Sequence, residues 1–380
     1  MMPHDYLIEA LAPLVFRSGK PFGSQAGADG AAFPLPSSLA GLVRTLYADQ
    51  HKEGFSDALR QIAVAGPLLA RREADGRTVP LLPKPNDALY LKDGADTCVI
   101  RLAPARLPSG AGCDLPEALM PVQMTRSLDG KPVVGPQFWP LERVIEWSAG
   151  AELDFHQLKV EGLASLATED RTHVALDRKT YAADDGRLFQ TGGIELTACQ
   201  DKQGWESHDL VFLGRGEVKL ASTLATFGGE RRLSRLHAAD TGHYWPAPPH
   251  ELDAQIRAAK GLRLTLATPA IFSAGHLPGW LDAQTLSGEP PACPGLSLRL
   301  RAAAIERWLP VSGWDLATNK ARAMRKAVAP GAVYWFELLG DPPSGFLDQL
   351  WLRPVSDHTQ DRHDGFGLAL PAAWLPPAHQ

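Results

Sequence analysis

The stretch Phe16-Arg-Ser-Gly-Lys-Pro-Phe22 stands between two segments that together decide the fold. Residues 6–16 before it are mostly apolar and predict a β-strand that ends at the turn Ser18-Gly19. Residues 23–32 after it are rich in glycine, and Pro36 then opens a helix. The helix has one apolar face, with residues at i, i+3, i+4, i+7 and i+8: Leu39, Leu42, Val43, Leu46 and Tyr47. A strand, a loop and a helix that packs back on the strand predict an α+β fold.

Other parts of the chain carry patterns of the same kind. Val174, Leu176 and the later pair Leu188-Phe189 flank the polar turn Asp184-Asp185-Gly186, which predicts a β-hairpin. Residues 262–266 alternate between apolar and polar side chains and predict a half-buried strand. We also expect strands at 210–213, 217–221, 296–300 and 333–339, and helices at 251–260 and 319–328.

The length of 380 residues predicts two domains, or one domain with a large insertion. We place the linker at Pro246 to Pro249, which gives an N-terminal domain of residues 1–245 and a C-terminal domain of residues 250–380. Short extended pieces between prolines predict that residues 51–150 form a large irregular insertion in the first domain.

The charge balance is slightly acidic, since 38 Lys and Arg face 43 Asp and Glu, for a net charge of −5. Such a chain binds nucleic acid only through a local basic surface. The four cysteines, at positions 98, 113, 199 and 293, are too far apart for a zinc or redox motif, and we expect reduced, mostly buried thiols. No apolar run approaches the ~18 residues that span a bilayer. We therefore expect a cytoplasmic protein without membrane contact.

The common signatures of enzymes do not occur in the sequence. It has no GxxxxGK phosphate loop, no GxSxG elbow, no HExxH motif and no GxGxxG after a strand. The acidic and histidine residues between Asp357 and Asp364 are not spaced like a known metal loop. We therefore assign no catalytic residue, no cofactor and no metal.

Three clusters have the composition of an RNA-binding site. Arg17, Lys20 and Phe22 surround Gly19, and this set suits phosphate contact by the cations and base stacking by the ring. The alternative is a solvated turn with a buried phenylalanine. The loop Gly228-Gly229-Glu230-Arg231-Arg232 suits an anion-binding backbone nest, or its arginines pair with nearby carboxylates.

The third cluster is the most basic stretch of the chain, residues 299–326. It holds seven Lys or Arg against two acids, and its cations are Arg299, Arg301, Arg307, Lys320, Arg322, Arg325 and Lys326. They either follow a nucleic-acid backbone or form a solvated helix face.

The expected hairpin adds polar residues of its own, Arg171, His173, Arg178, Lys179 and Tyr181. A histidine and a tyrosine there suit a metal-independent ribonuclease or base stacking. The alternative is an edge hairpin with a polar outer face.

The chain resembles the Cmr-type RAMP subunit of type III-B CRISPR complexes, because short motifs of that family occur here in the same order. This subunit is the member that binds the 5′ handle of the guide RNA. The motifs span nearly the whole chain: 16–22, 33–44, 66–67, 83–87, 169–174, 186–189, 228–231, 268–272, 312–314, 331–334 and 365–370. The match is poorest between residues 95 and 150. Asn319-Lys-Ala-Arg322 replaces a family Pro-Lys-Pro, and Pro371-Ala-Ala-Trp374 lacks the family glycine.

The resemblance implies two ferredoxin-like (RRM-like) halves and a subunit without chemistry of its own. Its implied partners are the guide-RNA handle, target RNA nearby, the large polymerase-type signature subunit and the first backbone RAMP subunit. The hairpin of residues 169–193 would act as a thumb. The residues expected at the RNA are Arg17, Gly19, Lys20, Phe22, Ser37, Arg44, Arg171, His173, Lys179, Arg231, Arg232, Lys320, Arg322, Gly365, Phe366 and Gly367.

Two other functions fit parts of the sequence. A RAMP ribonuclease that cuts repeat RNA would use His173 as its general base. A scaffold that contacts only proteins would suit the acidic net charge.

Overall fold

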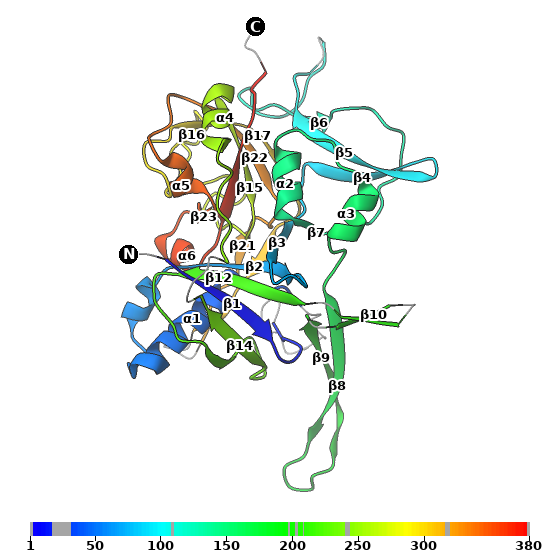
Figure 1. Cartoon of the computed structure of the whole chain (residues 1–380), viewed down its shortest axis with the longest axis vertical. Coiled ribbons are helices and arrows are strands. Elements are labelled where there is room, and N and C mark those ends of the chain that lie inside the picture. Colours follow the sequence, from blue (N-terminus) through cyan, green and yellow to red (C-terminus); the bar gives the residue numbers. More distant parts are fainter. Residues whose placement is uncertain are drawn as a thin grey trace. The chain divides into compact units, whose positions relative to one another are not determined.

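The computed structural model describes residues 3–16, 32–107, 110–196, 198–201, 204–207, 209–239, 244–315 and 320–377. Within these ranges the chain is a mixed α/β protein, mostly strands with few helices (Figure 1). It divides into two compact units. Unit 1 comprises Met1–Thr78, Leu166–Tyr244 and Leu309–Lys326, and unit 2 comprises Val79–Ser165, Trp245–Trp308 and Ala327–Gln380.

The core of unit 1 is an antiparallel sheet with strand order β13-β14-β1-β12-β2. The strands are β1 His4–Ala10, β2 Val64–Arg72, β12 Leu210–Gly216, β13 Thr223–Thr226 and β14 Leu233–Ala238. The first expected strand is therefore shorter than predicted, because after Ala10 only Leu14 and Val15 form isolated bridges. The expected strand at 217–221 is wrong, since the next strand begins at Thr223.

Helix α1, Pro36–His51, connects β1 to β2 and confirms the predicted apolar face. Leu39 packs so closely on the sheet that a Cβ at Gly66 or Gly214 would lie 2.9 or 3.0 Å from its Cδ2. The helix begins at Pro36, as predicted; Leu35 is the N-cap residue and no side chain caps the end. Proline suits the first helical position because it has no amide to satisfy.

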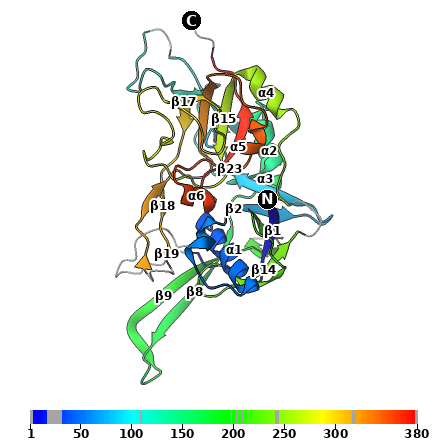
Figure 2. The same ribbon diagram turned by 90° about the vertical axis from the view of Figure 1, so that its left-hand side faces the viewer.

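The predicted hairpin is present in unit 1 as β8, Ala167–Leu176, and β9, Ala183–Glu195. Figures 1 and 2 show it projecting away from the sheet of unit 1. Its turn lies at residues 177–182, while the expected turn at Asp184 to Gly186 belongs to β9. Asp177 accounts for the difference, because its carboxylate accepts the amides of Lys179 and Thr180 and closes the turn there.

Short strand pairs complete unit 1. They are β10 Ala198–Asp201 with β11 Gly204–Ser207, β18 Leu309–Val311 with β21 Arg325–Ala327, and β19 Trp314–Asp315 with β20 Lys320–Ala321. The expected helix at 319–328 is therefore wrong. Its alanines, arginines and methionine favour a helix locally, but strand pairing overrides that weak preference.

Unit 2 contains a second antiparallel sheet, with strand order β16-β17-β22-β15-β24-β23. The strands are β15 Gly261–Leu266, β16 Ser287–Gly288, β17 Leu298–Ala304, β22 Val333–Leu338, β23 Arg353–Pro354 and β24 Leu368–Ala373. Its helices are α4 Leu252–Ala259, α5 Phe346–Leu350 and α6 Thr359–His363. Central strand β15 is buried on both faces, so the prediction of a half-buried strand there is wrong.

One face of β15 is covered by residues 79–165, which supply Asp87 and Ser148 as partners of Arg263 and belong to unit 2. The prediction of an irregular insertion is wrong for this segment, because strands and helices fill it: β3 Thr78–Pro83, β4 Ala88–Asp93, β5 Asp96–Pro104, β6 Val122–Met124, β7 Phe138–Pro140, α2 Leu141–Ser148 and α3 Phe155–Glu161. Prolines lie at the ends of several of these strands and interrupt the apolar pattern, so the sequence did not predict the strands.

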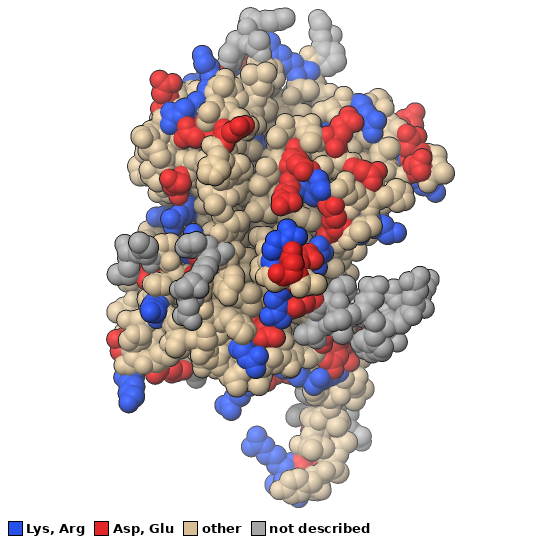
Figure 3. Space-filling view, viewed as in Figure 1, with Lys and Arg blue, Asp and Glu red and all other residues tan. Residues whose placement is uncertain are grey.

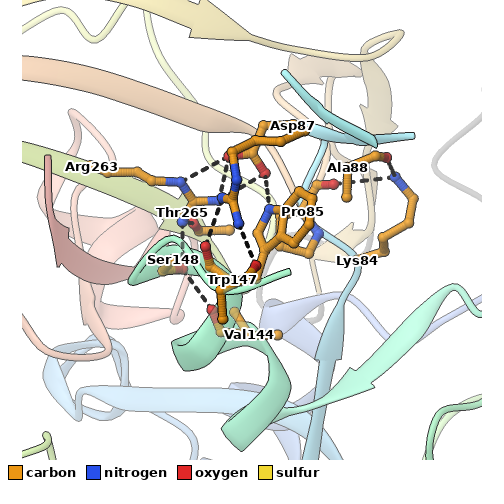
Figure 4. A network of polar contacts seen from close by, with 11 residues as sticks. Lys84, Pro85, Asp87, Ala88, Val144, Trp147, Ser148, Arg263 and Thr265 are labelled. Carbon is orange, nitrogen blue, oxygen red and sulfur yellow. Dashed lines mark hydrogen bonds and ion pairs between the residues drawn. The ribbon is translucent and has the colours of Figure 1, made fainter. Parts of the chain in front are cut away.

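A buried ion pair joins this segment to β15 (Figure 4). The guanidinium of Arg263 donates to both carboxylate oxygens of Asp87 at 2.8 to 3.0 Å, and the two side chains are only 4% and 2% exposed. Arg263 also donates to the hydroxyls of Ser148 and Thr265, and the Trp147 indole donates to Asp87 at 2.8 Å. A buried charge pair is tolerated because these bonds satisfy its remaining donors and acceptors.

Asp87→Asn should lower the free energy of unfolding by about 3–5 kcal/mol, because it leaves the Arg263 cation buried without a counter-charge. Urea unfolding followed by tryptophan fluorescence measures this loss, since Trp147 contacts Asp87 directly. The matched control is Asp253→Asn, which breaks the exposed pair with Arg257 and should cost under about 1 kcal/mol. Equal losses in the two variants would contradict the prediction.

Candidate nucleic-acid interface

Three segments that are distant in sequence meet at one place in unit 1. The chain that leads into position 17 forms two backbone hydrogen bonds with the base of the hairpin, between Leu14 and Ile194, at 2.9 and 2.7 Å. One residue later, the carbonyl of Val15 accepts the amide of Gly229 at 2.7 Å. The hairpin base and the loop of residues 228–232 thus flank the last described residues before Arg17.

Glycines make this close approach possible. Gly228 has φ +82°, and a Cβ there would lie 2.6 Å from the carbonyl oxygen of Val15. A Cβ at Gly193 would lie 3.1 Å from the side chain of Pro13. Beneath the loop, the ring of Phe16 packs edge-on against Phe227 at 5.0 Å and is buried. The backbone next to Arg17 is therefore held by packing and hydrogen bonds.

The loop turns through an unusual backbone conformation. Glu230 and Arg231 both have positive φ, 57° and 53°, in the left-handed region that favours glycine and asparagine. Such residues are costly and concentrate at functional sites. The turn leaves Arg231 exposed and Arg232 half-buried.

Two arginines of the site are already paired with glutamates two residues earlier in the chain. On β8, Arg171 binds Glu169 with Nε–Oε1 and Nη2–Oε2 distances of 2.6 and 3.1 Å. In the loop, Arg232 Nη2 lies 2.8 Å from Glu230 Oε2. The hydrogen bond from Arg171 lowers the pKa of Glu169, with a smaller contribution from the charge of Arg232.

The two pairs also act on each other across the site. The charge of Glu230 contributes to the raised pKa of Arg171, after the larger effect of its own partner Glu169. Glu169 faces Gly193 in the hairpin register, and Gly193 contacts the same Pro13–Leu14 segment that the loop flanks. We call these four residues, Glu169, Arg171, Glu230 and Arg232, the paired-charge cluster.

His173 lies further out on the same face of β8 as Arg171. Its Nε2 lies 2.8 Å from the hydroxyl of Thr191, the residue opposite Arg171 on β9. A general base needs a basic nitrogen directed at substrate. The contact with Thr191 occupies one of its two ring nitrogens.

The outer part of the hairpin carries exposed apolar side chains on its other face. Val174 and Leu188 are opposite each other and are 44% and 71% exposed, and Leu176 is 57% exposed. The turn adds Tyr181, 80% exposed, and the exposed cations Arg178 and Lys179. Figure 3 shows this positive charge at the free end of the hairpin. The surface suits contact with bases as well as phosphates.

The outcome differs among the other residues of the expected RNA-binding set. Arg17, Gly19, Lys20 and Phe22 lie outside the described residues. Lys320 and Arg322 are exposed on and beside β20.

Two further members of the set belong to α1. Ser37 lies in its first turn. Arg44 donates from Nε and Nη2 to the carbonyl of Ile62 at 3.2 and 2.9 Å, so this cation holds the chain between α1 and β2.

The residues expected to form an RNA-facing loop in unit 2 are buried. Phe366 is 1% exposed, so its ring does not present a face for base stacking. Thr268 donates to the carbonyl of Gly365 and accepts the amide of Gly367, which fixes the loop inside unit 2. Both glycines have positive φ, and this requirement of the fold explains why glycine stands there. The burial of Phe366 contradicts base stacking by its ring, whereas RNA contact by Gly365 and Gly367 stays a prediction.

The thiols and acidic groups that the structure describes form no metal-binding centre. Cys293 is buried, but Cys98 is partly exposed and Cys113 is exposed, which corrects the expectation of mostly buried thiols. Within the described ranges, no three His, Cys, Asp or Glu side chains are placed to hold a metal ion. No helix in those ranges is long and apolar enough to cross a membrane.

The sequence interpretation did not identify the glutamates of the paired-charge cluster. The signal was available, because Glu169-Asp-Arg171 and Glu230-Arg-Arg232 share the spacing Glu-x-Arg. Residues two apart on a strand point to the same face, so this spacing on β8 places an acid beside a base.

A family model described as "CRISPR-associated protein (Cas_Cmr3)" matches residues 6–374. Two solved chains are similar over 87% of this chain and 86% of their own length. One is from "Cryo-EM structure of the Type III-B Cmr-beta bound to cognate target RNA and AMPPnP, state 1", with 14% identity and a TM-score of 0.47. The other is from "Cryo-EM structure of the Type III-B Cmr-beta bound to cognate target RNA", with 16% identity and a TM-score of 0.46.

A third similar chain is from "Crystal structure of Csm3-Csm4 subcomplex in the type III-A CRISPR-Cas interference complex". It has 11% identity and a TM-score of 0.40 over 98% of this chain and 100% of that chain. No curated protein matches the sequence. The family assignment rests on the family model, because the structural likenesses are distant.

Gly228→Ala should destabilise unit 1 by about 2 kcal/mol, because a side chain at φ +82° is strained and its Cβ would overlap the Val15 carbonyl. Gly229→Ala is the control in the same loop: its φ is not positive and its Cβ would lie 3.3 Å from that oxygen. We expect a loss under about 1 kcal/mol there. Thermal unfolding of the two variants measures the difference, and similar losses would contradict the role of Gly228.

Proposed function

The chain belongs to the Cmr3 family of CRISPR-associated proteins, and from this premise we propose that it is an RNA-binding subunit of a type III-B effector complex. In this function it holds the 5′ handle of the guide RNA in the cytoplasm and performs no chemistry itself. It also joins the large polymerase-type signature subunit to the first backbone RAMP subunit, with target RNA nearby.

One observation carries the proposal. The segment leading to Arg17, the base of the hairpin and the loop with Arg231 and Arg232 meet in unit 1, although they are far apart in the sequence. Together they bring cations and glycine backbone to one place, which is what recognition of an RNA backbone requires. The order of the motifs alone implied no such proximity.

We further infer that the two sheets form two ferredoxin-like halves. In unit 1 the strands β1, β2, β12 and β14 lie in the order β14-β1-β12-β2, which is fourth, first, third, second in chain order. In unit 2, β15, β17, β22 and β24 lie in the equivalent order β24-β15-β22-β17. The ferredoxin-like fold has one helix after its first strand and one after its third strand. Unit 1 has α1 at the first of these places, and unit 2 has α5 and α6 at the second.

The hairpin is proposed as the thumb at the junction between handle and guide. Its inner part carries His173 and the Glu169–Arg171 pair of the paired-charge cluster, and its outer part exposes Leu176, Tyr181 and Leu188. This division supports phosphate contact near the base and contact with bases further out.

The ribonuclease hypothesis remains a distinct alternative, favoured only by His173. Incubating the purified chain with repeat RNA distinguishes the two functions. Cleavage that disappears in His173→Ala would replace the proposed function, whereas intact RNA agrees with it. A purely protein-binding scaffold is tested by crosslinking the assembled complex, since a salt-dependent RNA crosslink at Arg171 or Arg232 would exclude it.

Arg171→Ala/Arg232→Ala should weaken binding of guide RNA about tenfold, because it removes two phosphate-binding cations. The slope of log affinity against log salt should fall by about 1.4. Filter binding over a salt series with the full chain measures both quantities.

The control is Arg71→Ala/Arg77→Ala, which removes the same charge from two arginines that are also paired with acids nearby in the chain. We expect little change there. An equal loss in both variants would show that net charge, and not the site, sets the affinity.

A further inference from the structure

We infer that Glu169 and Glu230 occupy, in the free subunit, the positions that RNA phosphates take on Arg171 and Arg232. The two glutamates would then be competitors that lower the affinity of the site for every RNA, so that weakly held RNA is lost first. This inference rests on the proposed function and adds to it a built-in competitor for each of two RNA-binding cations.

The geometry of the pairs resembles that of an arginine on a phosphate. Glu169 accepts two bonds from Arg171 in a bidentate arrangement, the same fork that guanidinium offers to phosphate oxygens. Glu230 accepts a bond from Arg232 at 2.8 Å. A phosphate therefore has to displace a carboxylate to reach either arginine by these donors.

The backbone of Glu230 gives an independent reason to assign it a role. It lies at φ 57°, followed by Arg231 at φ 53°, where asparagine and glycine are favoured. A turn built only for stability would use those residues. Glutamate at this strained position is explained if its side chain is needed to meet Arg232.

Arg232 also retains capacity for a ligand. Its side chain is 15% exposed, and its buried Nε has no hydrogen-bond partner among the described residues. A buried donor without a partner is unfavourable, and a movement of the side chain that brought this donor to an RNA oxygen would relieve the cost. The pair with Glu230 thus holds the guanidinium without satisfying it.

The exposure of the Glu169–Arg171 pair makes this pair displaceable. Glu169 and Arg171 are 38% and 44% exposed, and ion pairs of this kind contribute little in water. Breaking an ion pair of this kind lowers the favourable binding free energy of every RNA complex by the same amount. Nonspecific RNA, which has few other contacts, is lost first, whereas a handle held by additional contacts stays bound.

The test measures binding of oligouridylate and of guide RNA from the same CRISPR locus to Glu169→Gln/Glu230→Gln in the full chain. We expect affinity for both RNAs to rise about tenfold, since both competitors are gone while the arginines remain. The ratio of the two affinities should stay within about twofold of the original, because the competitor acts on every RNA alike.

The control is Glu73→Gln/Asp75→Asn, which changes the net charge by the same +2. Its acids pair with Arg71 and Arg77, two residues away, at 2.9 and 2.6 Å, and none of these four residues belongs to the paired-charge cluster. We expect less than about a twofold change there, since only the long-range charge differs.

The outcomes separate the two claims. A rise confined to Glu169→Gln/Glu230→Gln supports the inference. Equal rises in both variants, or no rise in the first while the original chain binds guide RNA, overturn the inference and leave the proposed function standing. Failure of the original chain and of both variants to bind either RNA overturns the inference and the proposed function together.

Discussion

The ion pair between Arg263 and Asp87 is the constraint on which unit 2 depends. An arginine in the central strand of a sheet cannot be left against apolar side chains, because burying an unpaired charge is very costly. The segment of residues 79–165 supplies the carboxylate, the Ser148 hydroxyl and the cover that excludes water. The buried Arg263 of β15 therefore depends on this segment for its counter-charge.

In unit 1 the charged side chains of the site are not buried as a fixed pair in the core. Its Glu169–Arg171 pair lies near the surface, where an ion pair is weak and can exchange partners. The rigid part of the site is the backbone, held by Val15, Gly228 and Gly229. A fixed backbone that presents exchangeable side chains suits a polyanion, because geometry is retained while counter-charges are replaced.

Much of the local structure followed from sequence patterns, and the failures have identifiable causes. The apolar face of α1 and the hairpin were predictable because short-range periodicity determines them. Burial of Arg263 was not, since Leu262 to Leu266 alternates like a half-buried strand and its partner Asp87 lies 176 positions earlier. Phe366 was expected at RNA because a flanking pair of glycines looks the same in a binding loop and in a buried turn. The site's cations were predictable from composition, but not their pairing with Glu169 and Glu230.

The separation of Asp87 from Arg263 also has a consequence for synthesis of the chain. Segments of unit 2 alternate along the sequence with segments of unit 1. At about 5–20 residues per second, Asp87 leaves the ribosome roughly 10–35 s before Arg263 does. The nascent N-terminal part must hold a carboxylate, destined for the interior, in water throughout that interval. A product truncated before Arg263 therefore leaves Asp87 without this partner.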